Sequence, residues 1–264
     1  MRKAMFRLFI IACALFGLVG AASAQDFQKT YPLSVDGEII IRNVSGNVVV
    51  NGYDGQQVNV SGIREGRDRV QVHVEDLSSG NRIELRARYP KNCRCDASIR
   101  FEVQVPRSVR YRFEELSSAS GDIEVRDVTG EVRINTASGD VMVEGVTGRV
   151  DASTASGQMR VRGVAGSVSA GTASGDVDVE MTRVDDNQRM VFSSASGDVN
   201  VRLPLNIDAY VEMSSASGEV KTDFPLAVKS ERYGSGQSAR GQLGNGSRRL
   251  RISSASGNVS LTSL

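Results

Sequence analysis

The chain contains no tryptophan, one histidine, three cysteines and only 5% aromatic residues among 264. A lone His73 without an acid or nucleophile partner forms no catalytic triad, and it leaves too few ligands for a zinc site. The apolar residues are chiefly valine, alanine, isoleucine and leucine. Such side chains suit a narrow, stacked interior better than a thick globular core, so the composition favours a repeat fold.

A strong charge of either sign is also missing, because the formal net charge is +1. The first 24 residues hold three basic residues and no acidic ones, so their removal would leave a formal charge of −2. A near-neutral chain of this kind disfavours nucleic acid or anionic lipid as a general partner. We therefore expect no nucleic-acid partner.

The first residues have the pattern of a secretory signal peptide over 1–24. A basic start at Met1-Arg2-Lys3 precedes an apolar run over 8–19 and an Ala22-Ser23-Ala24 site, with cleavage expected before Gln25. The apolar run is shorter than the roughly 20 residues of a membrane span. Lipidation at Cys13 is a weaker alternative and the only route by which we expect membrane attachment. The prediction is a secreted protein of the periplasm or cell surface.

Two cysteines remain after this cleavage, Cys93 and Cys95. In a straight strand their Cα atoms would lie about 6.6 Å apart, near the outer limit for a disulfide. The preceding Pro90 indicates a bend that brings them closer, so we predict a local disulfide in an oxidising compartment. A redox role is a weaker alternative, because no helix start lies nearby to lower a thiol pKa.

The most informative stretch runs from Ser117 to Glu180, where glycine recurs every nine residues from Gly121 to Gly175. Rows with Ala-Ser-Gly alternate with rows with Val-Thr-Gly or Val-Ala-Gly, so the full period is eighteen residues. A fixed period is the signature of a stacked repeat. Each row is interpreted as a short strand followed by a bend at glycine, because its apolar spacing is not helical.

The third, seventh and ninth positions of each row are small or apolar and share one parity. In an extended chain they would face one side, so we predict that the alanine column is buried with the valine columns. The members of that alanine column are Ala119, Ala137, Ala155 and Ala173.

Charges also repeat with the eighteen-residue period. Arg126, Glu144, Arg162 and Glu180 form a column of alternating sign. Residues on neighbouring strands lie about 4.8 Å apart, where opposite charges attract. The sequence therefore predicts an all-β fold, a parallel β-solenoid (β-helix-like) with about 18 residues per coil and two strands in each coil.

The repeat is looser outside this stretch. Residues 25–115 are predicted to form an irregular β-rich N-terminal segment with degenerate repeats that caps one end. Residues 116–264 are predicted to form the solenoid, with insertions near 183–192, 203–210 and 224–248. The last insertion is rich in glycine and serine, so we expect it to be a mobile loop.

The second and fourth positions of the Ala-Ser-Gly rows are hydroxyl residues. If both point outward, they form a flat ladder beside the buried alanine column and offer a binding face. The alternative is that short hydroxyl side chains simply suit tight β-stacking and turns. The residues of this candidate face are Ser118, Ser120, Thr136, Ser138, Thr154, Ser156, Thr172 and Ser174.

Two other functions occur among proteins with repeats of this kind, and details of this repeat disfavour both. Nine-residue repeats with Gly and Asp occur in calcium-binding β-rolls, but those require Gly-Gly-x-Gly-x-Asp, and here Gln158 interrupts the aspartate column. A solenoid enzyme acting on polysaccharide needs paired carboxylates in a cleft, whereas these acids are spread along the stack and match basic residues. We expect no catalytic residue, cofactor or metal site.

The signal peptide, the opening Ser45-Gly46-Asn47-Val48-Val49-Val50 and the serial Ser/Thr-Ala-Ser-Gly-Asp-Val repeats resemble the bacterial putative-adhesin family of β-strand-repeat proteins. That family carries a domain of unknown function, and the resemblance extends from Tyr31 to Leu264. It implies a β-solenoid of the cell envelope with an adhesive or scaffolding role and offers no catalytic residues. The expected partner is an envelope glycan or another envelope protein.

Overall fold

The computed structural model describes residues 26–185, 189–230 and 235–264. The predicted signal peptide and Cys13 lie outside these residues, as do parts of the 183–192 and 224–248 insertions. The described part consists of β-strands and one short 3-10 helix, η1 (Arg69–Gln71), so the all-β class is confirmed. Within it, no helix is long and apolar enough to span a membrane.

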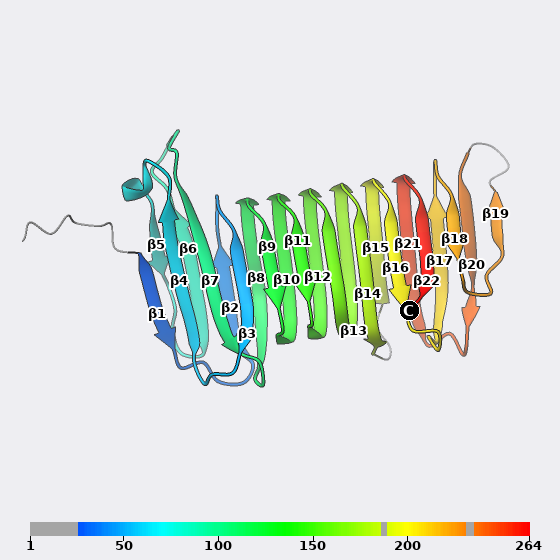
Figure 1. Cartoon of the computed structure of the whole chain (residues 1–264), viewed down its shortest axis with the longest axis horizontal. Helices are drawn as coiled ribbons and strands as arrows, with labels where there is room; N and C mark the ends of the chain where they lie inside the picture. Colours follow the sequence, from blue (N-terminus) through cyan, green and yellow to red (C-terminus); the bar gives the residue numbers. More distant parts are fainter. Residues whose placement is uncertain (1–25, 186–188, 231–234) are drawn as a thin grey trace, which may run out of the picture.

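Strands of the regular repeat stack in chain order along the long axis of the molecule (Figure 1). Most neighbours pair in parallel, and residues eighteen apart lie opposite each other, as in Thr129–Thr147–Ala165. The strands of this stack are β8 (Arg110–Ser120), β9 (Ile123–Arg126), β10 (Thr129–Ser138), β11 (Val141–Glu144), β12 (Thr147–Ser156), β13 (Met159–Ser174), β14 (Val177–Val184), β15 (Arg189–Ser196) and β16 (Val199–Leu203).

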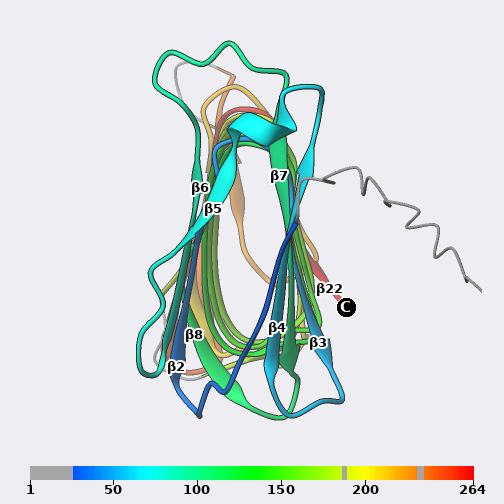
Figure 2. The same cartoon turned by 90° about the vertical axis from the view of Figure 1, so that its left-hand side faces the viewer.

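The stack has two facing layers (Figure 2). We call layer 1 the side formed by β8, β10, β12, the later part of β13 and β15, which pair in that order. Layer 2 is formed by β9, β11, the first part of β13, β14 and β16. Each coil contributes one strand to each layer, because a glycine bend turns the chain from layer 1 to layer 2.

The core is a ladder of aliphatic side chains between the layers. Val132 and Ile134 of layer 1 and Val141 and Val143 of layer 2 are at most 2% exposed. Gly139, between them, has φ of +152°, and a Cβ there would lie 2.3 Å from the carbonyl oxygen of Gly121 in the previous coil. Only glycine permits this backbone approach, which explains its strict recurrence.

The predicted burial of the alanine column is wrong. Strand β10 alternates inward and outward through Val132, Ile134 and Thr136, so Thr136 is buried and Ala137 is exposed. Ala137 and Ser138 both point outward, and the bend at Gly139 then restarts the alternation with the opposite parity. The same exposure holds for Ala119, Ala155 and Ala173. The prediction assumed that the inward and outward positions alternate without interruption across the glycine bend, whereas the alternation shifts by one residue there.

The N-terminal segment does not simply follow chain order. β2 pairs with both β6 and β8, and β3 pairs with both β7 and β9, all in parallel. The coil of β2 and β3 therefore lies inside the stack, between two coils that follow it in sequence. The strands are β2 (Gly37–Arg42), β3 (Val48–Tyr53), β6 (Arg82–Arg88) and β7 (Ser98–Pro106).

Antiparallel strands cover this end. β4 (Val58–Glu65) pairs with β7, β1 (Phe27–Tyr31) pairs with β4, and β5 (His73–Asp76) pairs with β6. Residues 25–115 thus contribute two parallel coils as well as the strands that cover the end of the stack.

The C-terminal end has a similar reversal. The last two strands, β21 (Arg248–Ser256) and β22 (Val259–Ser263), lie between the coil of β15 and β16 and the coil of β17 (Ala209–Ser215) and β18 (Val220–Thr222). β20 (Gln237–Leu243) then pairs antiparallel with β17, and β19 (Val228–Ser230) with β20. The insertion near 224–248 therefore holds two strands in its described part, not only a loop, because Ala239 and Leu243 are buried.

Candidate functional site: the outer face of layer 1

The structure divides the predicted hydroxyl ladder into two columns. Ser118, Thr136, Thr154 and Thr172 are buried, with exposed fractions of 4% to 8%. Ser120, Ser138, Ser156 and Ser174 are exposed, on the same side as the alanine column. Half of the predicted binding face therefore lies inside the protein, and the exposed alanines, which were predicted to lie in the core, join the other half.

The buried hydroxyls hold one coil to the next. Thr154 Oγ1 donates to the carbonyl oxygen of Gly139 at 3.3 Å, and Thr172 Oγ1 donates to that of Gly157 at 3.4 Å. The bond recurs in the less regular coils, where Ser254 Oγ donates to Gly197 O at 2.8 Å. Each hydroxyl thus bonds a bend carbonyl at the place where glycine brings two backbones together.

Aspartate and asparagine form a second column at the same bends. Asp122 Oδ1 accepts the backbone N–H of Asp140 at 2.9 Å, and Asp140 Oδ1 accepts that of Gln158 at 2.8 Å. Asp198 Oδ1 likewise accepts the N–H of Asn258 at 2.7 Å. These carboxylates bond the backbone of the next coil. In the described residues, no group of three or more His, Cys, Asp or Glu is arranged to hold a metal ion.

The exposed small residues line an open groove of about 730 Å³ on the outer face of layer 1. It crosses β12, β13, β15, β21 and β17, which are neighbours in the sheet. We call it the small-residue trough; its outward-facing residues include Ser153, Gly171, Ala173, Ser193, Ala195 and Ala255. The alanines were not predicted on this face, although the alternation from Val132 through Thr136 places them outside when it is continued by one residue.

Charged side chains are densely paired on the N-terminal half of this face. The carboxylate of Glu84 in β6 forms ion pairs with the guanidinium groups of Arg42 at 2.8 Å, Arg82 at 2.6 Å and Arg86 at 2.5 Å. Arg42 also bonds Glu115 of β8 at 2.8 Å. The hydrogen bonds from Arg86 and Arg82 lower the pKa of Glu84 below its ordinary value. This network ties three adjacent strands together.

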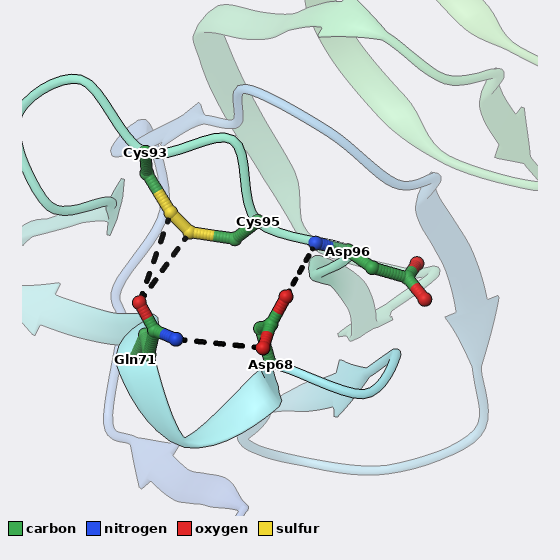
Figure 3. Close-up of a disulfide and its surroundings, with 5 residues drawn as sticks. All are labelled: Asp68, Gln71, Cys93, Cys95 and Asp96. Atoms are coloured by element: carbon green, nitrogen blue, oxygen red, sulfur yellow. Dashed lines mark hydrogen bonds between the residues drawn. A yellow bond between two sulfur atoms is a disulfide. The ribbon is translucent and has the colours of Figure 1, made fainter.

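The two cysteines lie in the loop between β6 and β7 and form a disulfide, with their Cα atoms 5.1 Å apart (Figure 3). The side chain of Gln71 faces the sulfurs, with its Oε1 3.7 Å from Cys95 Sγ. Asp68 Oδ2 accepts the backbone N–H of Asp96 at 2.8 Å. The disulfide loop is thereby attached to η1 at the N-terminal end of the stack.

A two-layered stack of short parallel strands with glycine bends defines a repeat β-protein. The Toastrack DUF4097 family model matches residues 29–262, which is most of the chain. The chain belongs to the Toastrack DUF4097 family.

Two solved structures are similar to this chain. One is a "putative cell adhesion protein" from Clostridium sporogenes, with a TM-score of 0.39 and 10% identity over 91% of this chain and 100% of that one. The other is a "putative adhesin" from Bacteroides fragilis, with a TM-score of 0.33 and 11% identity over 90% of this chain and 98% of that one. No curated protein matches the chain.

Proposed function

We propose that this protein is a non-enzymatic, adhesin-like scaffold of the cell envelope, built on a parallel β-solenoid of eighteen-residue coils. It is exported through the signal peptide expected at 1–24 and acts in the periplasm or at the cell surface. Its partner is an envelope glycan or another envelope protein, which lies along the outer face of layer 1.

The small-residue trough is the observation that carries this proposal. Its lining consists chiefly of serine, alanine, threonine and glycine, so a ligand approaches close to the strand backbones over five coils. Hydrogen bonds from the buried threonine column and to the aspartate column at the bends hold adjacent coils in register. A surface held in this way loses little conformational freedom when it binds an extended ligand.

Filling the trough tests the proposal. The purified chain is sedimented with envelope fractions and with intact cells, together with the variants Ala173→Arg and Ala195→Arg. Both alanines are exposed, so arginine there occupies the trough without entering the core. We expect saturable binding by the natural chain and its loss in both variants.

Ala137→Arg is the matched control, because Ala137 is exposed in the same column and does not line the trough. It should bind like the natural chain. Absence of binding by the natural chain, or equal loss in the control, would contradict the trough as the binding face.

A separate assay tests the absence of catalysis: envelope polysaccharide incubated with the chain should release no new reducing ends.

A further inference from the structure

A second hollow, of about 410 Å³, lies on the same face near the C-terminal end. Arg189 of β15 is opposite Arg249 of β21, which is in turn opposite Tyr210 of β17. One outward row further on, Arg251 of β21 is opposite Glu212 of β17. These five residues line the hollow, which we call the arginine hollow. Figure 1 shows β15, β21 and β17 at this end of the stack.

These arginines differ from those of the N-terminal half. There, Arg42, Arg82 and Arg86 surround Glu84, and Arg149 bonds Asp151 at 2.8 Å. In the described part of the chain, by contrast, no ion pair involves Arg189, Arg249 or Arg251. All three are exposed. Their guanidinium groups are therefore available to a ligand.

The pairing of Arg189 with Arg249 is unfavourable without a ligand. The two residues are directly opposite on neighbouring parallel strands, about 4.8 Å apart, where like charges repel. An anionic group bound between the two guanidinium groups would attract both of them and so offset this repulsion. Guanidinium groups bind carboxylate and phosphate through two parallel hydrogen bonds, so an anion of either kind fits the pair.

Tyr210 and Glu212 narrow the choice of anion. The side chain of Tyr210 is 38% exposed beside Arg249, and an aromatic ring in such a place gives a sugar ring an apolar surface. Glu212 is opposite Arg251 on one side and Arg240 of β20 on the other. Its carboxylate accepts hydrogen bonds from hydroxyl groups, which every ring of a sugar polymer carries.

We propose that the arginine hollow binds an acidic glycan, a sugar polymer that carries carboxylates beside free hydroxyls. Arg189 and Arg249 hold a carboxylate, Tyr210 supports a sugar ring, and Glu212 accepts a hydroxyl. The inference rests on the proposed function and deepens it. The hollow adjoins the small-residue trough on the same strands, since Arg251 precedes Ser253 of the trough by two residues on β21.

Polygalacturonate, a polymer of carboxylated sugars, is the probe for this site. Calorimetry should show saturable binding to the purified chain that weakens as salt is added. The double variant Arg189→Gln/Arg249→Gln should bind at least about tenfold more weakly. The probe should raise the melting temperature of the natural chain and not that of the variant. Without the probe the variant should melt no lower, because it loses a repulsive pair.

Arg160→Gln/Arg162→Gln is the matched control, with the same change of charge on layer 2. Its affinity for polygalacturonate should equal that of the natural chain. Equal weakening in this control, or unchanged binding in the Arg189/Arg249 variant, would overturn the site. Equally tight binding of polyglutamate or single-stranded DNA would overturn the glycan as its ligand.

The envelope sedimentation separates this inference from the proposed function. If the natural chain and the Arg189/Arg249 variant bind envelope fractions equally, the scaffold function stands and the acidic glycan is not its ligand. If polygalacturonate binds at the hollow while envelope fractions are not bound, the site stands and the adhesin-like function fails.

Discussion

At the residue scale, the hydroxyl of the repeat is an internal hydrogen-bond donor. Thr154 shows this most fully, because its Oγ1 reaches Gly139 O at 3.3 Å and Ser156 O at 3.2 Å while the side chain is only 6% exposed. A hydroxyl in this place supplies a hydrogen-bond partner for the backbone carbonyl at the glycine bend. The repeated threonine is therefore explained by the stability of the stack.

The change Thr154→Val tests this role. It keeps the shape of the side chain and removes the donor, so we expect a loss of about 1 kcal/mol in the free energy of unfolding. That corresponds to a fall of roughly 2–4 °C in the melting temperature for a chain of this size. Thr154→Ser, which keeps the hydroxyl, should lose less. A valine variant as stable as the natural chain would show that the bond contributes nothing.

In the aspartate column, two substitutions of Asp140 separate the effect of the hydrogen bond from that of the charge. Asp140→Asn keeps an oxygen that accepts the N–H of Gln158, so its melting temperature should remain within about 1 °C of the natural value. Asp140→Ala leaves that N–H without its side-chain partner and should cost about 1 kcal/mol. Thermal melts followed by circular dichroism measure both. Equal losses in the two variants would indicate that the charge matters and the hydrogen bond does not.

At the scale of the element, β1 is the outermost strand at the N-terminal end, and one carboxylate anchors it. Asp76 Oδ2 accepts hydrogen bonds from Lys29 at 2.6 Å and Tyr31 at 3.0 Å, and Asp76 Oδ1 accepts the N–H of Ser78 at 3.0 Å. Burial alone would raise the pKa of Asp76, but these hydrogen bonds outweigh it and lower the pKa to about 2. The same burial raises the pKa of Tyr31.

This pKa predicts acid sensitivity of the anchor. Because the folded pKa lies below the ordinary value of 3.8, the stabilisation is present above about pH 4 and is lost as pH falls towards 2. At neutral pH, Asp76→Asn should lower the free energy of unfolding by about 1 kcal/mol, allowing for solvent screening.

Thermal melts at a series of pH values measure this. The difference between the natural chain and Asp76→Asn should shrink as the pH falls from about 4 to about 2. Asp54→Asn is the control, because this carboxylate is 84% exposed beside Arg107 and its removal should have little effect. A difference that does not change with pH would contradict the assignment to the Asp76 anchor.

At the scale of the whole molecule, both ends of the stack depart from chain order. The C-terminal strands β21 and β22 are enclosed by strands that precede them in sequence on both sides. Leu250, Ile252, Val259 and Leu261 are consequently buried, although they lie within fifteen residues of the C-terminus. A chain terminus placed in this way should be among the more stable parts of the fold.

Hydrogen exchange measures that expectation directly. The amides of β21 and β22 should exchange as slowly as those of β12 and β13, because they pair on both sides. The amides of β19, which within the described residues pairs with β20 alone, should exchange faster and serve as the internal comparison. Rapid exchange throughout β21 and β22 would contradict their position inside the stack.

The repeat could be predicted from the sequence because each coil contacts chiefly its immediate neighbours. The glycine period and the charge columns Arg126–Glu144–Arg162 depend only on contacts between adjacent coils, and the observed pairs Val141–Met159 and Glu144–Arg162 have that spacing. The alternation up to Ala137 could also have been read from the sequence, but the change of parity within the bend could not. The alternation through Thr136 continues from the preceding strand and changes at Ser138 and Gly139, which composition does not record.

The sequence by itself thus determined the all-β class, the eighteen-residue spacing and the glycine bends, because these follow from local alternation and nearest-neighbour stacking. Only the tertiary structure decided which residues meet at the ends. Arg189, Tyr210 and Arg249 come together because β21 inserts between β15 and β17, a choice made by the burial of whole strand faces. Such pairing joins residues 60 apart at the C-terminal end and 75 apart at the N-terminal end, and it leaves no period in the sequence.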